Sequence, residues 1–139
     1  MSDGQKGLYF AHPINTYNTP LEASLLEAIK QAFPDQVILN PNSPEHQAGF
    51  QQYKEAGNSM LYFSKEVLPS CLGCVALPFP DGKWGAGVYK EMLDIFVMGF
   101  PLWSIDPLTK ISELPELPGG VITIAETRRR IKLPYEEAV

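Results

Sequence analysis

Short apolar runs alternate with longer segments of helical periodicity along most of the chain, and this alternation constrains the fold more than any other feature. The apolar runs lie at residues 7–11, 36–39, 73–77 and 101–105, and such short runs suit strands that are buried on both faces. The connections are short. This order predicts an α/β fold of the flavodoxin or Rossmann-like kind, with one doubly wound parallel sheet, helices on both faces and a single domain over residues 1–139.

Apolar spacing and capping residues predict the helices. The clearest helix begins at Thr19, where a Thr-Pro-Leu-Glu sequence supplies an N-cap, a proline at the first helical position and a glutamate for a capping box. We expect it to end near Phe33. Other helices are expected over residues 44–54, 60–68, 86–98 and 123–132. Residues 106–120 are expected to form a loop over the subunit surface, and residues 133–139 a tail that docks on a neighbouring subunit.

The composition argues against several kinds of partner. The chain has 139 residues and a net charge of -5, whereas nucleic-acid polymers and anionic membranes both require a basic face. The one basic cluster, residues 128–130, is interpreted as the solvated side or the C-terminal side of a short helix, not as a binding patch. The N-terminus has no apolar signal region, and no apolar run approaches the ~18 residues that span a bilayer. A cytoplasmic protein with no membrane partner is therefore expected.

The two cysteines form one Cys-x-x-Cys pair, Cys71 and Cys74. Such a pair is typical of a redox site or of half a zinc site. Zinc needs two further ligands, and the two histidines, His12 and His46, stand far away in the sequence without metal-ligand spacing. Because the cysteines open an apolar strand, we interpret them as buried thiols and expect no metal.

The turn after the third apolar run is the predicted ligand site. Residues 77–91 have the pattern of a strand end, a glycine-rich turn and a helix start, and open α/β sheets bind ligands at the carboxyl ends of their strands. Gly85 and Gly87 let a substrate approach the backbone. These glycines lack the order of the Rossmann fingerprint, and the chain has no Gly-x-x-x-x-Gly-Lys-Ser/Thr sequence. Nicotinamide binding and nucleoside triphosphate hydrolysis are therefore disfavoured, and no cofactor is expected.

Glu91 is the candidate reactive residue in this stretch. On a helix it shares a face with Gly87 and Ile95, so its carboxylate is expected beside bare backbone and above apolar packing. A helix that starts near Gly87 would keep this carboxylate ionised through its dipole, which favours a nucleophile or an electrostatic stabiliser over a general acid. The alternative is a solvent-facing glutamate that borders a glycine.

Three other polar residues lie at ends of the predicted strands or next to them. Tyr9, inside the first strand, could orient Glu91 or could simply fill the core. His12 follows that strand, where phosphates and sugar hydroxyls are often held, or it is a loop histidine without a ligand. Asp81 could bind sugar hydroxyls or transfer a proton, or it could only form the turn before Gly82.

Taken together, these residues resemble the nucleoside 2-deoxyribosyltransferase family and its nucleotide N-glycosidase relatives. The resemblance covers roughly residues 7–105 in element order, and it rests on the Leu-Tyr-Phe-Ala run at 8–11 and the Gly-Val-Tyr-Lys-Glu run at 87–91. In that family a strand tyrosine orients a glutamate that attacks the anomeric carbon, and Tyr9 and Glu91 match those positions. The resemblance implies cleavage or exchange of the N-glycosidic bond of a nucleoside or nucleoside monophosphate through a glycosyl-enzyme.

The chain departs from the family where the leaving base needs a proton donor. The usual acid, an aspartate six residues before the glutamate, falls on Gly85, so Asp81 would have to act from a longer loop. Two further family aspartates fall at about Ser64 and at Leu72. Under another alignment of the glycines, Tyr89 would take the place of the glutamate.

The loop after the second strand should face Glu91 across the cleft, which makes Asn40, Asn42 and His46 candidate contacts for the base or the sugar, with ordinary turn chemistry as the alternative. In the family, neighbouring subunits complete each site, so a homo-oligomer is implied and residues 135–137 could serve a partner's pocket. A non-catalytic nucleotide-binding module is the alternative function. A flavodoxin-like signalling or redox domain is a more distant one.

Overall fold

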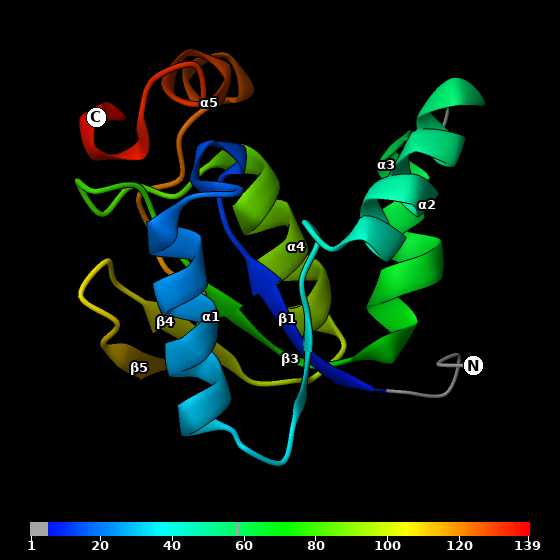
Figure 1. Ribbon diagram of the computed structural model, residues 1–139, viewed down its shortest axis with the longest axis horizontal. Coiled ribbons are helices and arrows are strands. Elements are labelled where there is room, and N and C mark those ends of the chain that lie inside the picture. Colours follow the sequence, from blue (N-terminus) through cyan, green and yellow to red (C-terminus); the bar gives the residue numbers. More distant parts are fainter. Residues whose placement is uncertain (1–5, 58) are drawn as a thin grey trace.

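Five strands form one sheet in the order β2-β1-β3-β4-β5 (Figure 1). The computed structural model describes residues 6–57 and 59–139. The strands are β1 (Gly7–Ala11), β2 (Val37–Leu39), β3 (Cys71–Ala76), β4 (Leu102–Ile105) and β5 (Ile111–Leu114). The first four run parallel, and β5 is antiparallel to β4. The predicted α/β class is confirmed, and the strand order is the flavodoxin-like one, with β1 and β3 adjacent.

Helices cover both faces of the sheet. They are α1 (Pro20–Ala32), α2 (Pro44–Glu55), α3 (Ser59–Tyr62), α4 (Ala86–Val97) and α5 (Ile124–Arg130). A π-helical turn, Phe63–Val67, continues α3, and short 3-10 turns lie at Ile14–Thr16, Leu68–Ser70 and Tyr135–Glu137. Figure 1 shows α2 and α3 as a pair beside α4, apart from α1. No helix within the described ranges is both long and apolar enough to cross a membrane.

Side-chain alternation along β1 divides the core into two layers. Leu8 and Phe10 pack against α1, whereas Tyr9 and Ala11 pack against α4 and the residues that follow α3. Successive side chains of β1 point to opposite faces, and both faces are covered, so every residue of β1 is buried. The same alternation directs the Tyr9 hydroxyl toward the helix that carries Glu91.

The start of α1 differs in one detail from the predicted capping box. The Thr19 hydroxyl accepts a hydrogen bond from the Glu22 N–H at 3.2 Å, as expected for an N-cap. The Glu22 carboxylate, however, accepts from the Asn18 N–H at 3.0 Å, one residue before the cap. Its other contacts reach across the structure to the ends of β1 and β2.

The C-terminal third departs from the predictions in two places. Residues 106–120 contain β5, which pairs with β4 from Leu102 opposite Leu114 to Ile105 opposite Ile111. Residues 133–139 dock on their own chain, where Tyr135 is buried against Phe79 and its hydroxyl donates to the carbonyl oxygen of Pro78. Packing of this kind leaves Tyr135 unavailable to a partner's pocket.

The two cysteines are free and buried, in agreement with their interpretation as buried thiols. Burial raises the pKa of the Cys71 thiol to about 12 and raises that of Cys74 as well, and the charge of Glu91 acts in the same direction on both. The reactive form of cysteine is the thiolate. Both side chains therefore act as core residues of the layer under α4.

Candidate functional site

A cavity of about 630 Å³ lies at the carboxyl end of β1, between α4 and the α2–α3 pair. This volume is in the range of pockets that enclose small organic ligands. The residues that line it come from β1 and its following loop, from α2, α3 and the π-helical turn, and from α4 and α5. Among them are Tyr9, His12, His46, Phe50, Tyr62, Phe63, Gly85, Gly87, Lys90, Glu91, Asp94 and Thr127.

Tyr9 and Glu91 meet in the wall of this cavity. Helix α4 begins at Ala86, so Glu91 lies in its second turn and faces the sheet layer that contains Tyr9. The Tyr9 hydroxyl donates to Oε2 of Glu91 at 2.7 Å. The Tyr9 ring is buried and packs edge-on against Phe63, with 5.0 Å between ring centroids. The contact expected from sequence is therefore present and is held by packing on its apolar side.

The electrostatic expectation for Glu91 is wrong. Burial raises the pKa of Glu91 to about 7, although the hydrogen bond from Tyr9 acts in the opposite direction. The helix dipole acts mainly within the first turn and does not compensate for the loss of water around the carboxylate. Burial and the neighbouring Glu91 raise the pKa of Tyr9 well above its ordinary value, so Tyr9 stays a hydrogen-bond donor. At neutral pH, Glu91 is therefore poised between its two forms.

An ion pair on α4 lies beside Glu91 in the same wall. Nζ of Lys90 contacts both carboxylate oxygens of Asp94, at 2.6 and 2.7 Å. Asp94 raises the pKa of Glu91 and Lys90 lowers it, so the two charges of the pair act in opposite directions on that carboxyl. This pair was not predicted from the sequence, although the i, i+4 spacing of Lys90 and Asp94 on one helix was the available signal.

Gly85 and Gly87 both line the cavity, but for different steric reasons. A Cβ atom on Gly85 would lie 3.2 Å from the Phe79 ring and 3.6 Å from Cγ2 of Thr127, so the residue at this position must be small. A Cβ atom on Gly87 would meet nothing within 4 Å. The open space at Gly87 is where a ligand can approach the start of α4. The Ala86 N–H between them donates to the Thr127 hydroxyl at 2.9 Å.

His12 lines the cavity, but its ring nitrogens are already engaged. Nδ1 donates to the Phe10 carbonyl oxygen at 2.9 Å, and Nε2 contacts Oε2 of Glu22 at 2.8 Å. Burial opposes ionisation of Glu22, but hydrogen bonds from His12, Asn18 and Asn42 outweigh it and lower the pKa of that carboxyl. A ligand can therefore contact only the face of the His12 ring, because neither ring nitrogen is free to bind phosphate.

Asn40 and Asn42 have structural partners instead of a place in the cavity wall. Nδ2 of Asn42 donates to both carboxylate oxygens of Glu22, at 3.0 and 3.2 Å, and to Oδ1 of Asn18 at 3.0 Å. Oδ1 of Asn40 accepts from the Asn42 N–H at 3.0 Å, which closes a turn. Neither asparagine is among the described residues that line the cavity. Their contacts tie the end of β2 to α1.

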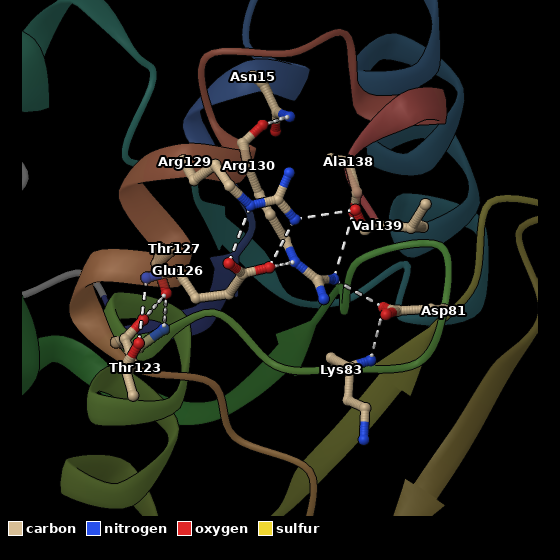
Figure 2. A network of polar contacts seen from close by, with 11 residues as sticks. Asn15, Asp81, Lys83, Thr123, Glu126, Thr127, Arg129, Arg130, Ala138 and Val139 are labelled. Carbon is tan, nitrogen blue, oxygen red and sulfur yellow. Dashed lines mark hydrogen bonds and ion pairs between the residues drawn. The ribbon is translucent and has the colours of Figure 1, made fainter.

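Asp81 is held away from the cavity by Arg130 (Figure 2). Its Oδ1 accepts from Nη1 of Arg130 at 2.9 Å and from the Lys83 N–H at 3.2 Å. The guanidinium also donates to Glu126 at 2.8 Å and to the Ala138 carbonyl oxygen at 3.3 Å. Hydrogen bonding to Arg130 lowers the pKa of Asp81, which makes it a poor proton donor. Residues 128–130 form the last turn of α5, as the interpretation of the C-terminal side of a short helix required, but Arg130 itself is buried and not solvated.

His46 and Tyr62 form a polar contact in the wall that faces α4. Nδ1 of His46 lies 2.8 Å from the Tyr62 hydroxyl oxygen. Burial lowers the pKa of His46, which favours the neutral ring at neutral pH. Phe50 packs edge-on against Tyr62 at 6.0 Å between ring centroids. Of these residues, only His46 was identified from the sequence; the aromatic spacing in residues 50–63 was the available signal.

Comparisons with known proteins identify no relative: no family model, no curated protein and no solved structure matches the chain. The functional assignment therefore depends on the geometry and chemistry of the cavity.

Proposed function

We propose that the protein cleaves or exchanges the N-glycosidic bond of a nucleoside or nucleoside monophosphate, including those with a 2′-deoxy sugar, with Glu91 as the nucleophile. The observation that carries this proposal is the 2.7 Å hydrogen bond from Tyr9 to Glu91 in the wall of the cavity. A carboxylate held by a buried tyrosine beside open space suits attack on a sugar carbon. The resemblance to deoxyribosyltransferases in the sequence supports the same reaction.

The proposed reaction uses the two carboxylate oxygens differently. Oε2 accepts the Tyr9 hydroxyl, while Oε1 has no hydrogen-bond partner among the described residues. Oε1 attacks C1′ of the sugar, the C1′–N bond breaks, and its electron pair leaves with the base. Water or a second base then attacks C1′ from the opposite side, which releases the carboxylate and retains the configuration of the sugar.

Glu91 must be ionised to attack. With a pKa of about 7, it loses its proton in the neutral range, and the Tyr9 hydroxyl stabilises the carboxylate once formed. Tyr9 thus acts as a positioning group that also increases the ionised fraction. The proposed reaction requires no cofactor, because displacement at C1′ needs only a nucleophile and help for the leaving base.

One observation favours a second function, a nucleotide-binding module without turnover. Asp81, the residue expected to protonate the base, is engaged with Arg130 and lies outside the cavity wall. If no other group assists the leaving base, the cavity would bind a nucleoside without cleaving it. The two functions make opposite predictions for product formation under the same conditions.

Incubation with a panel of nucleosides, deoxynucleosides and their monophosphates, with and without a second free base, separates these functions. Base release indicates a hydrolase, and base exchange indicates a transferase. Glu91→Gln is expected to abolish both, whereas Glu27→Gln, on the exposed face of α1, should retain them. Binding without turnover would support the module, and full activity in Glu91→Gln would overturn the catalytic assignment.

A covalent glycosyl-enzyme provides a direct second test. A 2′-fluorinated nucleoside slows the second displacement, so the intermediate should accumulate. Mass spectrometry should then find the fluorinated sugar on the peptide that contains Glu91. Modification of another residue would assign the nucleophile elsewhere.

A further inference from the structure

We propose that His46 is the residue that assists the leaving base: its Nε2–H donates a hydrogen bond to the base and stabilises the negative charge that develops there. This inference rests on the proposed function. It assigns to α2 the part of the reaction that Asp81, held by Arg130, cannot perform.

The direction of attack on the sugar is what assigns this role to His46. A nucleophile displaces a leaving group from the opposite side of the carbon, so Glu91 on α4 sends the base toward the facing wall. That wall is formed by α2 and α3, which lie beside α4 in Figure 1, and it carries His46, Phe50 and Tyr62. Phe50 is 44% exposed, and its ring offers a planar base a surface on which to stack.

The contact with Tyr62 selects the tautomer of His46. The Tyr62 hydroxyl can satisfy its hydrogen by donating to Nδ1 of His46, and it has no other hydrogen-bond acceptor among the side chains and backbone groups that the structure describes. A donating hydroxyl requires an unprotonated Nδ1, and a neutral imidazole then carries its hydrogen on Nε2. Nε2 has no hydrogen-bond partner in the described part of the chain, and the ring lines the cavity. One N–H donor is therefore free for a ligand.

Packing fixes the orientation of this pair. Gly49 lets the Tyr62 ring pass against α2, because a Cβ atom there would lie 2.7 Å from the Tyr62 hydroxyl oxygen and closer still to the ring. The Tyr62 ring is held edge-on by Phe50 and by Tyr53, at 6.0 and 5.5 Å. The backbone of His46 is fixed at the start of α2, because its backbone N–H donates to the Ser43 hydroxyl at 3.3 Å. A donor fixed in this way needs little reorganisation when the base departs.

The proposed step balances without a further reagent. The bond from Oε1 of Glu91 to C1′ forms as the C1′–N bond breaks, and the electron pair of the broken bond stays on the base. The base leaves as an anion that accepts the Nε2–H hydrogen bond of His46. Hydrolysis of the glycosyl-enzyme by water releases one proton, and the base takes up one proton.

Substrates whose bases need different amounts of assistance test this role. Two pairs of substrates are compared, and the modified member of each needs less assistance. The first pair is 2′-deoxyguanosine and its N7-methyl derivative, whose base leaves uncharged. The second is 2′-deoxyuridine and its 5-fluoro derivative, whose base is more acidic. His46→Ala is expected to reduce kcat/KM on the unmodified members about 100-fold, the lower range for a proton or hydrogen-bond donor to a leaving group. The loss on the modified members should be at least tenfold smaller. His46→Gln, which keeps an N–H donor, should recover part of the activity.

Two further variants and the activity of the unmodified protein separate this inference from other outcomes. Gln51→Ala, on the exposed face of α2, should leave kcat/KM unchanged on both members of each pair. Tyr62→Phe should reduce kcat/KM less than His46→Ala does, with the same dependence on the substrate. Equal losses on both members of a pair would show that His46 acts only through structure, and no loss would show that the reaction does not need it. Either result would overturn the inference while Glu91-dependent turnover remains. Absence of turnover by the unmodified protein on every nucleoside would instead overturn the proposed function itself, and this inference with it.

Discussion

Glu91 is the residue whose chemistry depends most on its surroundings. Since the nucleophile is the ionised form, kcat/KM should rise about tenfold per pH unit below the pKa and level off above it. With a pKa of about 7, the bend should fall near neutral pH. A profile of kcat/KM from pH 5 to 9 measures it. A profile that falls through pH 7 would indicate instead that Glu91 acts as a proton donor.

Tyr9→Phe should shift the bend in the profile of kcat/KM against pH to a higher pH. The substitution keeps the ring that packs on Phe63 but removes the hydrogen bond that lowers the pKa of Glu91. A hydrogen bond to a charged group contributes about 1.5–3 kcal/mol, so the shift should be about one unit or more. Tyr89→Phe is the matched control, because Tyr89 lies on α4 but not among the described cavity residues. An unchanged bend in Tyr9→Phe would contradict the positioning role.

Glu91 should also make the folded state less stable at alkaline pH. Its pKa is about 4.5 when unfolded and about 7 when folded, so between these values the folded protein binds more protons. The free energy of unfolding therefore falls as pH rises through this window, by at most about 3 kcal/mol and by less if water in the cavity shields the charge. Glu91→Gln should be more stable than the unmodified protein at pH 8 and similar to it at pH 4.5. Urea unfolding at both pH values tests this, and equal stability at pH 8 would contradict it.

The pairing of Tyr9 with Glu91 was one of two alternatives for Tyr9 in the sequence, and the resemblance to deoxyribosyltransferases was what favoured it over a core-filling role. The ionisation of Glu91 could not be predicted from the sequence, since it depends on the side chains that enclose the carboxylate. The partner of Asp81 was equally hidden, because Arg130 lies 49 residues further along the chain. No local pattern links two charges at that separation.

At the scale of elements, the contact between α2 and α3 depends on Gly49. Gly49→Ala should improve helix propensity by about 1 kcal/mol, yet the added methyl group would collide with the Tyr62 ring. Overpacking costs about 1–3 kcal/mol, so we expect a net loss of stability. Gly87→Ala, where the methyl group meets nothing within 4 Å, should gain stability instead. Urea unfolding of the two variants measures both, and a gain in Gly49→Ala would show that Tyr62 can move aside.

Sequence periodicity was sufficient for the central strands and for the capped helices, because each buries a face with a regular pattern. It failed for β5, an edge strand in which Ile111 and Leu114 are half-buried and the two residues between them are exposed. That pattern does not alternate, so the strand is recognisable only from its pairing with β4. The predicted fold class did not depend on it.

At the scale of the whole molecule, Arg130 joins α5, the C-terminal tail and the turn after β3 (Figure 2). Arg130→Ala would leave Asp81 without its charged partner, and we expect a loss of stability on the order of 2 kcal/mol. Asp81→Asn, which keeps a hydrogen-bond acceptor, should cost less and should keep kcat within about threefold, since a group outside the cavity has no proton to give to the base. Thermal unfolding and steady-state kinetics measure the two effects. A hundredfold loss of kcat in a folded Asp81→Asn protein would restore Asp81 as the acid.

The peripheral position of α2 links ligand affinity to local folding. None of its residues, all of which the structure describes, is fully buried, and α2 packs mainly against α3. Its amide hydrogens should therefore exchange through local opening that leaves the sheet intact. A ligand that fills the cavity touches α2 only when this helix is formed, so part of its binding free energy is spent on ordering α2. The intrinsic helicity of a surface segment thereby becomes a determinant of the dissociation constant.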